Sequence, residues 1–214
     1  MSRSRNAGSH VPLLPDFRRE AERRGLLDAG APLDVQTAFA LVRDMPWVAN
    51  ADTLPEVTLV ERRGHDASKH YLLRQLLYEL GHPSILVACA HTWSIESAEW
   101  ATGEARAILE AGPVADVHTF LRVDSDEGWS TVDATWPLAT SHLGLPANER
   151  FVPGREMRVA ADPEELYHVP DDADPEEFRR RLLDAHLDER GPRARERRNA
   201  FRAALGSWLA AELR

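Results

Sequence analysis

Cysteine and long apolar runs are scarce in this sequence of 214 residues. Its one cysteine, Cys89, excludes an intrachain disulfide and any zinc site built mainly from cysteines. No apolar run approaches the roughly 18 to 20 residues that a membrane-spanning helix needs. The polar N-terminal stretch has no apolar segment of signal-peptide length behind it. We therefore expect a soluble, cytoplasmic protein.

Basic residues are also fewer than acidic residues. Lysine and arginine together number 26 against 35 aspartates and glutamates, which gives a formal net charge of −9, and Lys69 is the only lysine. A surface with this balance does not attract nucleic acid or an anionic membrane. The preference for arginine over lysine is typical of a GC-rich genome and says nothing about function. We expect neither nucleic acid nor membrane as a partner.

Hydrophobic residues make up 43% of the chain, which is enough for the core of one domain of this length. Residues 1–12 are rich in small and polar side chains and predict a flexible tail. A single domain is expected over 13–214, with its core at about 35–160 and C-terminal helices at about 175–213.

Hydrophobic periodicity predicts an α+β fold. Helices are expected over 17–27, 34–43, 67–80, 97–111, 175–188 and 193–213, with Asp34 and Asp174 as N-caps. The helix at 67–80 has the clearest apolar stripe. Segments 84–91, 117–123 and 129–134 predict strands, and the last two form an antiparallel hairpin. The long helix is expected to pack on this sheet, and residues 138–158 are expected to be mostly loop.

Three polar side chains stand where they could meet. Asp66 lies where the chain enters the long helix, and a helix N-terminus stabilises an anion. His118 and Asp133 lie on the two strands of the hairpin. Together they match the order of a nucleophile, a base and an orienting acid. A structural N-cap at Asp66 and a structural His–Asp hydrogen bond would explain the same residues.

The segments around these residues resemble the small bacterial branch of the transglutaminase-like superfamily. The nucleophile motif of that branch is approximately Gly-Thr-Cys-Ser-Thr-Lys-His, and residues 64–70 here are Gly-His-Asp-Ala-Ser-Lys-His. The similarity continues in Asp-Val-His-Thr-Phe at 116–120 and Val-Asp-Ala-Thr-Trp-Pro at 132–137, and it covers about residues 35–213. It implies a papain-like core in which a cysteine, a histidine and an aspartate form the catalytic triad.

The chain departs from that family at the nucleophile, because Asp66 stands where the family has its cysteine. A carboxylate is a much poorer nucleophile toward amides than a thiolate. Ordinary transglutaminase or cysteine-protease activity is therefore not expected. Cys89 lies in a segment that predicts a buried strand, where a thiol is usually inert.

Three functions remain open on the sequence. In the first, Asp66, His118 and Asp133 form an altered triad that performs hydrolysis, elimination or cyclisation on a small molecule, without a cofactor and as part of a specialised biosynthetic pathway. The pKa of His118 between two carboxylates is then expected to be raised. In the second, the chain is a catalytically inactive binding or scaffold protein. In the third, it is a metal-dependent enzyme with ligands drawn from His65, Asp66, His70, His91 and His118.

Other side chains have simpler expected roles. Four residues near the ends of the predicted elements are candidate substrate-binding residues: His65, His70, His91 and Trp93. Trp129 is expected in the core, and Lys69 is expected to form a structural ion pair, with Glu61 as the candidate partner. The sequence identifies no protein partner.

Overall fold

A computed structural model of the chain describes residues 11–213. Of the tail predicted over 1–12, residues 1–10 lie outside this range, while the Val11 carbonyl accepts a hydrogen bond from Gln75 Nε2 at 3.0 Å. The elements of the described part follow one another in this order: α1 (Leu14–Arg23), α2 (Val35–Arg43), α3 (Pro55–Glu61), α4 (Asp66–Glu79), β1 (Ser84–Trp93), α5 (Gly103–Glu110), β2 (Val114–Val123), β3 (Ser130–Val132), the 3-10 helix η1 (Leu138–Leu143), β4 (Pro163–His168), α6 (Pro175–Glu189) and α7 (Ala194–Glu212).

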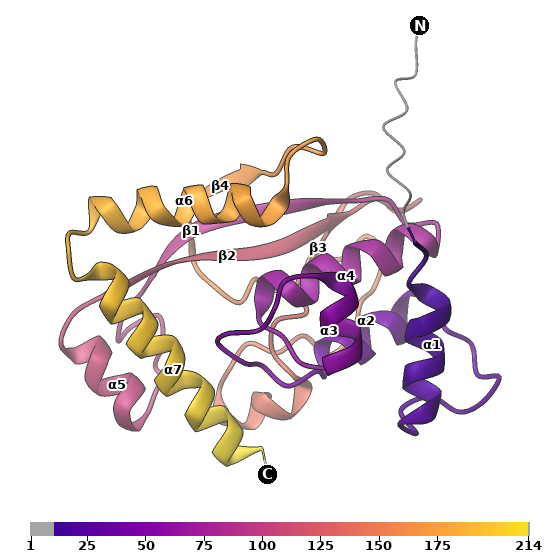
Figure 1. Ribbon diagram of the computed structural model, residues 1–214, viewed down its shortest axis with the longest axis horizontal. Helices are drawn as coiled ribbons and strands as arrows, with labels where there is room; N and C mark the ends of the chain where they lie inside the picture. The colour runs from indigo at the N-terminus through magenta and orange to yellow at the C-terminus, as the bar shows by residue number, and fades with distance from the viewer. Residues whose placement is uncertain (1–10, 214) are drawn as a thin grey trace, which may run out of the picture.

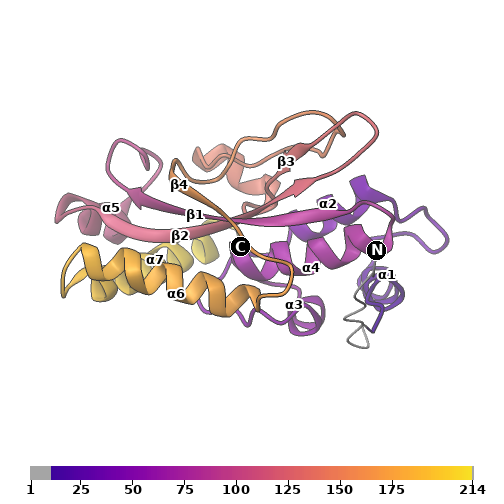
Figure 2. The ribbon, with the colours of Figure 1, turned by 90° about the horizontal axis from the view of Figure 1, so that it is seen from above.

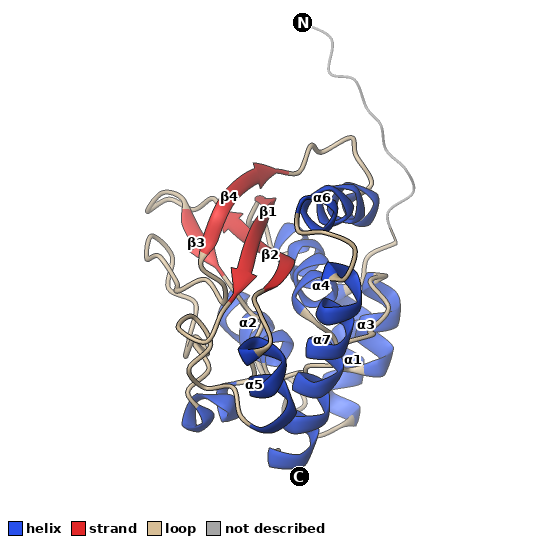
Figure 3. Ribbon diagram, turned by 90° about the vertical axis from the view of Figure 1, so that its left-hand side faces the viewer, coloured by secondary structure: helices blue, strands red, loops and turns tan. Residues whose placement is uncertain are grey.

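The strands form one antiparallel sheet in the order β3-β2-β1-β4, so the protein has the predicted α+β architecture. The paired strands β1 and β2 are the longest, and their register sets Ala88 opposite Thr119 and Cys89 opposite His118. Figure 2 shows the sheet along its edge, with α4 and α6 running along one side of it. Figure 3 shows the same division, with the strands on one side and most of the helices on the other.

The main core lies between α4 and the sheet. The leucine stripe of α4, which the sequence predicted, is fully buried at Leu72, Leu73, Leu76 and Leu77. It packs with apolar side chains of α1, α2, β1, β2 and α6. This packing fixes the direction of α4 and therefore the place where its N-terminus meets the sheet.

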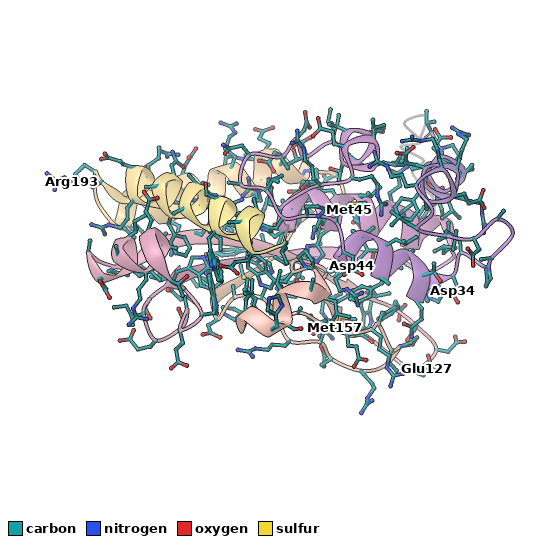
Figure 4. All side chains as sticks on the ribbon, turned by 90° about the horizontal axis from the view of Figure 1, so that it is seen from below. Asp34, Asp44, Met45, Glu127, Met157 and Arg193 are labelled. Carbon is teal, nitrogen blue, oxygen red and sulfur yellow. The ribbon has the colours of Figure 1, made fainter. Side chains whose placement is uncertain are left out.

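A second apolar cluster forms at the far end of β1 and the start of β2. It contains Trp47, Trp93 and Trp136, with Phe201 and Leu205 from α7. Figure 1 shows α7 beside α5, with α6 above them. Arg193, just before α7, and Asp34, the N-cap of α2, lie at opposite ends of the molecule (Figure 4).

Local signals in the sequence predicted several boundaries correctly. Asp34 Oδ1 accepts from Thr37 N at 2.8 Å and Asp174 Oδ1 accepts from Glu177 N at 2.7 Å, so both predicted N-caps are confirmed. The hairpin of β2 and β3 is also present. The helix expected over 97–111 is shorter, because α5 begins only at Gly103.

Three features differ from the prediction. Helix α3 was not among the predicted helices, and Pro55 is its first residue. Strand β4 was not predicted, because its side chains are mostly polar and exposed and its position depends on the free edge of β1. Trp129 is not a core residue, because the turn before β3 leaves it 45% exposed.

None of the helices within residues 11–213 combines the length and the apolar character needed to cross a bilayer.

Candidate active site

The start of α4 is built around His65, which corrects the expectation that Asp66 caps this helix. His65 Nδ1 accepts from Ala67 N at 3.2 Å, and Ser68 Oγ accepts from His65 N at 2.8 Å. A β carbon at Gly64 would lie only 2.5 Å from Ser68 Oγ, so this turn requires glycine. Because His65 takes the capping role, the Asp66 carboxylate is free to face the sheet.

Asp66 meets β2 at a gap in the sheet. Strand β3 pairs with β2 only from Leu121 onward, which leaves the preceding residues of β2 without a strand neighbour on that side. Asp66 Oδ2 accepts a hydrogen bond from Thr119 N at 3.0 Å there. The N-terminus of α4 thus lies beside the part of β2 that β3 does not cover, and this places Asp66 next to His118.

His118 lies between two carboxylates, as the sequence predicted. Its Nε2 is 2.8 Å from Asp133 Oδ2, and its Nδ1 is 3.6 Å from Asp66 Oδ2. Asp133 is held in place by backbone donors: Oδ2 accepts from Ala160 N at 2.8 Å and Oδ1 accepts from Thr135 N at 2.9 Å. The structure therefore brings Asp66, His118 and Asp133 together, and each is at most 5% exposed.

His70 connects the two carboxylate-bearing segments. Its Nε2 accepts from Ala134 N at 2.8 Å, so its Nδ1 carries the proton and donates to the Asp66 carbonyl at 2.8 Å. Burial lowers the pKa of His70 to about 4, which keeps the ring neutral near pH 7. Both nitrogens of this fully buried ring are used within the fold, so the geometry gives His70 a positioning role.

The three central residues form a charged array. Burial alone would lower the pKa of His118, but the charges of Asp133, Asp66 and Asp116 outweigh it and raise that pKa. Burial would likewise raise the pKa of Asp66, yet His65, His118 and Arg202 hold it well below its ordinary value. The pKa of Asp133 is lowered in the same way against burial, chiefly by His118. These shifts favour an imidazolium at His118 and carboxylates at Asp66 and Asp133.

A third buried carboxylate, Asp116 of β2, escaped the sequence reasoning. Its Oδ1 accepts from Arg198 Nε at 2.6 Å, and its Oδ2 accepts from Arg202 Nη1 at 3.1 Å. Both arginines belong to the Arg-rich segment 190–202. Asp116 thus holds α7 against the site, and Arg202 Nη1 also lies 3.9 Å from Asp66 Oδ1.

The space beside Asp66 and His118 is a narrow cavity of about 20 Å³. Its volume fits one water molecule. Among the described residues, three side chains of its wall have a buried polar atom without a hydrogen-bond partner: His91 Nδ1, Thr135 Oγ1 and Trp136 Nε1. Phe201, Arg202 and Leu205 of α7 close it on another side. A molecule larger than water reaches Asp66 only if α7 or a tryptophan ring moves.

The four candidate substrate-binding residues do not lie at one common cavity. His91 and Trp93 wall the cavity, and burial lowers the pKa of His91 to about 4. His65 Nδ1 lies 3.3 Å from Asp66 Oδ1, and His65 also forms part of the wall of a second, polar cavity. His70 is not part of either wall. Across residues 11–213, no three His, Cys, Asp or Glu side chains come together in an arrangement that could hold a metal ion.

Lys69 and Cys89 are both enclosed by the fold. Lys69 is not paired with Glu61 as expected: its Nζ donates to the carbonyls of Arg43 and Thr135, each at 2.9 Å. Cys89 is fully buried although it lies opposite His118 in the register. Burial, with Asp133 and Asp66 nearby, raises the pKa of its thiol, so Cys89 stays protonated and does not replace the missing nucleophile.

Comparison with models of known families, with curated proteins and with solved structures finds no match to this chain.

Proposed function

We propose that the protein is a cytoplasmic enzyme with a transglutaminase-like core, in which Asp66, His118 and Asp133 perform acid/base chemistry on a small molecule. The observation that carries the proposal is that a candidate proton acceptor and a candidate proton donor line the same cavity. Asp66 and His118 both line a space that fits one water molecule, and their pKa shifts favour a carboxylate at Asp66 and an imidazolium at His118. Of hydrolysis, elimination and cyclisation, this arrangement favours hydrolysis.

The proposed step balances its protons within the site. Asp66 takes a proton from the attacking water, and His118 gives the proton of its Nδ1 to the leaving group. Asp133 keeps the ring oriented through its 2.8 Å contact with His118 Nε2. The proton on Asp66 then returns to His118 across the 3.6 Å that separates them, which restores the starting charges.

A binding or scaffold function is the second candidate, and the small volume of the cavity favours it. The 20 Å³ space admits no organic substrate in this conformation, and α7 is held down by the pair of arginines on Asp116. In that case the buried charges serve the fold alone. The two candidates differ in whether Asp66 affects turnover.

Turnover is tested on a panel of small esters, amides, lactones and phosphoesters, with products followed by mass spectrometry. The wild-type protein and Asp188→Asn, which alters an exposed carboxylate, are expected to turn over one class of compound. Asp66→Asn is expected to be slower by about 100-fold or more, because the base is lost. Full activity of Asp66→Asn would contradict the proposal, while saturable binding without turnover in any variant would support the scaffold function.

A further inference from the structure

A second cavity, of about 410 Å³, lies beside the candidate active site between the loop at 49–53, α6 and α7. We call it the arginine pocket. Arg202 belongs to its wall and also to the wall of the small cavity at Asp66. The donors of the arginine pocket are Asn50, His65, Arg179, Arg198, Asn199 and Arg202. The wall of the arginine pocket is therefore rich in N–H groups and exposes little apolar surface.

Arg179 is the clearest sign that the pocket is incomplete by itself. The residue is only 8% exposed, and its Nε and Nη2 donate to the two carboxylate oxygens of Glu176, each at 2.9 Å. Its Nη1 is buried and has no hydrogen-bond partner among residues 11–213. A buried guanidinium nitrogen without an acceptor is unfavourable. An acceptor supplied by a ligand would remove that penalty once the guanidinium turned toward the cavity.

The other two arginines share one carboxylate. Arg198 uses only its Nε for Asp116. Arg202 reaches the other oxygen of the same side chain with Nη1, and its Nη2 donates to the Ala49 carbonyl at 3.2 Å. The two carboxylates in the pocket wall are already hydrogen-bonded, because Arg179 donates to both oxygens of Glu176 and Asp52 Oδ1 accepts from Leu54 N at 2.8 Å. Donors therefore exceed acceptors inside the arginine pocket.

From this excess we infer that the arginine pocket binds the oxyanion group, carboxylate or phosphate, of a small molecule. A planar guanidinium matches both groups through paired N–H donors. The volume of the pocket lies in the range of small-molecule sites. Arg202 belongs to the walls of both cavities, so an anion bound here would contact a side chain that also lines the space beside Asp66. The inference concerns binding and holds whether or not Asp66 turns the molecule over.

Sodium phosphate and sodium acetate are titrated separately into the protein at constant ionic strength, and the arginine Nε–H signals are followed by NMR. Saturable shifts are expected for Arg179, Arg198 and Arg202. Arg195, which makes an exposed ion pair with Asp184, is expected to remain unshifted. Tenfold tighter binding of one anion identifies the preferred group, and similar binding of both indicates a general oxyanion site.

Matched variants sharpen the test. Arg179→Gln is expected to weaken binding by at least about tenfold, because a charge-assisted hydrogen bond is lost. Arg195→Gln removes the same charge at the surface and is expected to leave binding unchanged. Arg179→Gln could fail to fold, but the shifts in the wild-type protein are decisive alone. The inference is overturned if neither anion gives saturable shifts, or if Arg195 shifts as much as Arg179.

Discussion

Asp116→Asn is expected to reduce the free energy of unfolding by about 3–5 kcal/mol, because it leaves two buried guanidinium groups without their carboxylate. Asp116 is 3% exposed, and against the effect of burial Arg198, Arg202 and His91 keep its pKa below the ordinary value. For a chain of this size the loss corresponds to a fall in Tm of roughly 6–20 °C. Urea unfolding and calorimetry measure it.

The matched control is Asp184→Asn, which breaks the exposed pair with Arg195. This substitution makes the same chemical change and is expected to cost less than about 1 kcal/mol. Amide hydrogen exchange adds a local readout, because Arg198 and Arg202 lie on α7. In Asp116→Asn, amide exchange in α7 should accelerate more than amide exchange in α4. Equal destabilisation by the two variants would show that Asp116 does not hold α7 in place.

Asp133→Asn is expected to cost a similar amount, about 3–5 kcal/mol near pH 6, because the His118 imidazolium loses its closest counter-charge. Either orientation of the new amide also points its NH₂ group at a donor, since Thr135 N and Ala160 N occupy the two oxygens of Asp133. Denaturant unfolding over a series of pH values measures the loss.

The pH dependence separates the charge effect from the hydrogen bonds. The raised pKa of His118 gives a stabilisation that is complete below the unfolded value of 6.5 and is lost as pH rises through the folded pKa. The variant lacks much of this contribution, so its deficit should shrink as the pH is raised. A deficit that is constant with pH would mean that His118 carries no charge in the folded protein.

Short-range signals explain why much of the fold could be predicted from the sequence. The apolar stripe of α4 and the caps at Asp34 and Asp174 act within a few residues, and all are present. Strand β4 could not be predicted, because its pairing depends on β1, more than 70 residues away in the chain. Trp129 shows the opposite error: it is apolar but lies beside a turn, which leaves it exposed.

The site was predictable to the same extent. Asp66 at a predicted helix start and His118 and Asp133 on two predicted paired strands indicated their meeting, although Asp133 lies just after the end of β3. The role of Asp116 was not visible, because its partners Arg198 and Arg202 lie 82 and 86 residues away in a segment whose charge pattern is typical of a surface. The cap at His65 was missed because histidine is an uncommon N-cap, whereas Asp66 next to it is a common one.

The central claim is that Asp66, His118 and Asp133 form one charged site, and an NMR titration of the His118 ring tests it most directly. His118 is assigned by its own substitution, and the wild-type protein is compared with Asp66→Asn and with the surface control Asp188→Asn. The pKa of His118 is expected to lie above 6.5 and to fall when Asp66 is neutralised, but not in the control. A His118 pKa at or below 6.5 that ignores Asp66 would contradict the account.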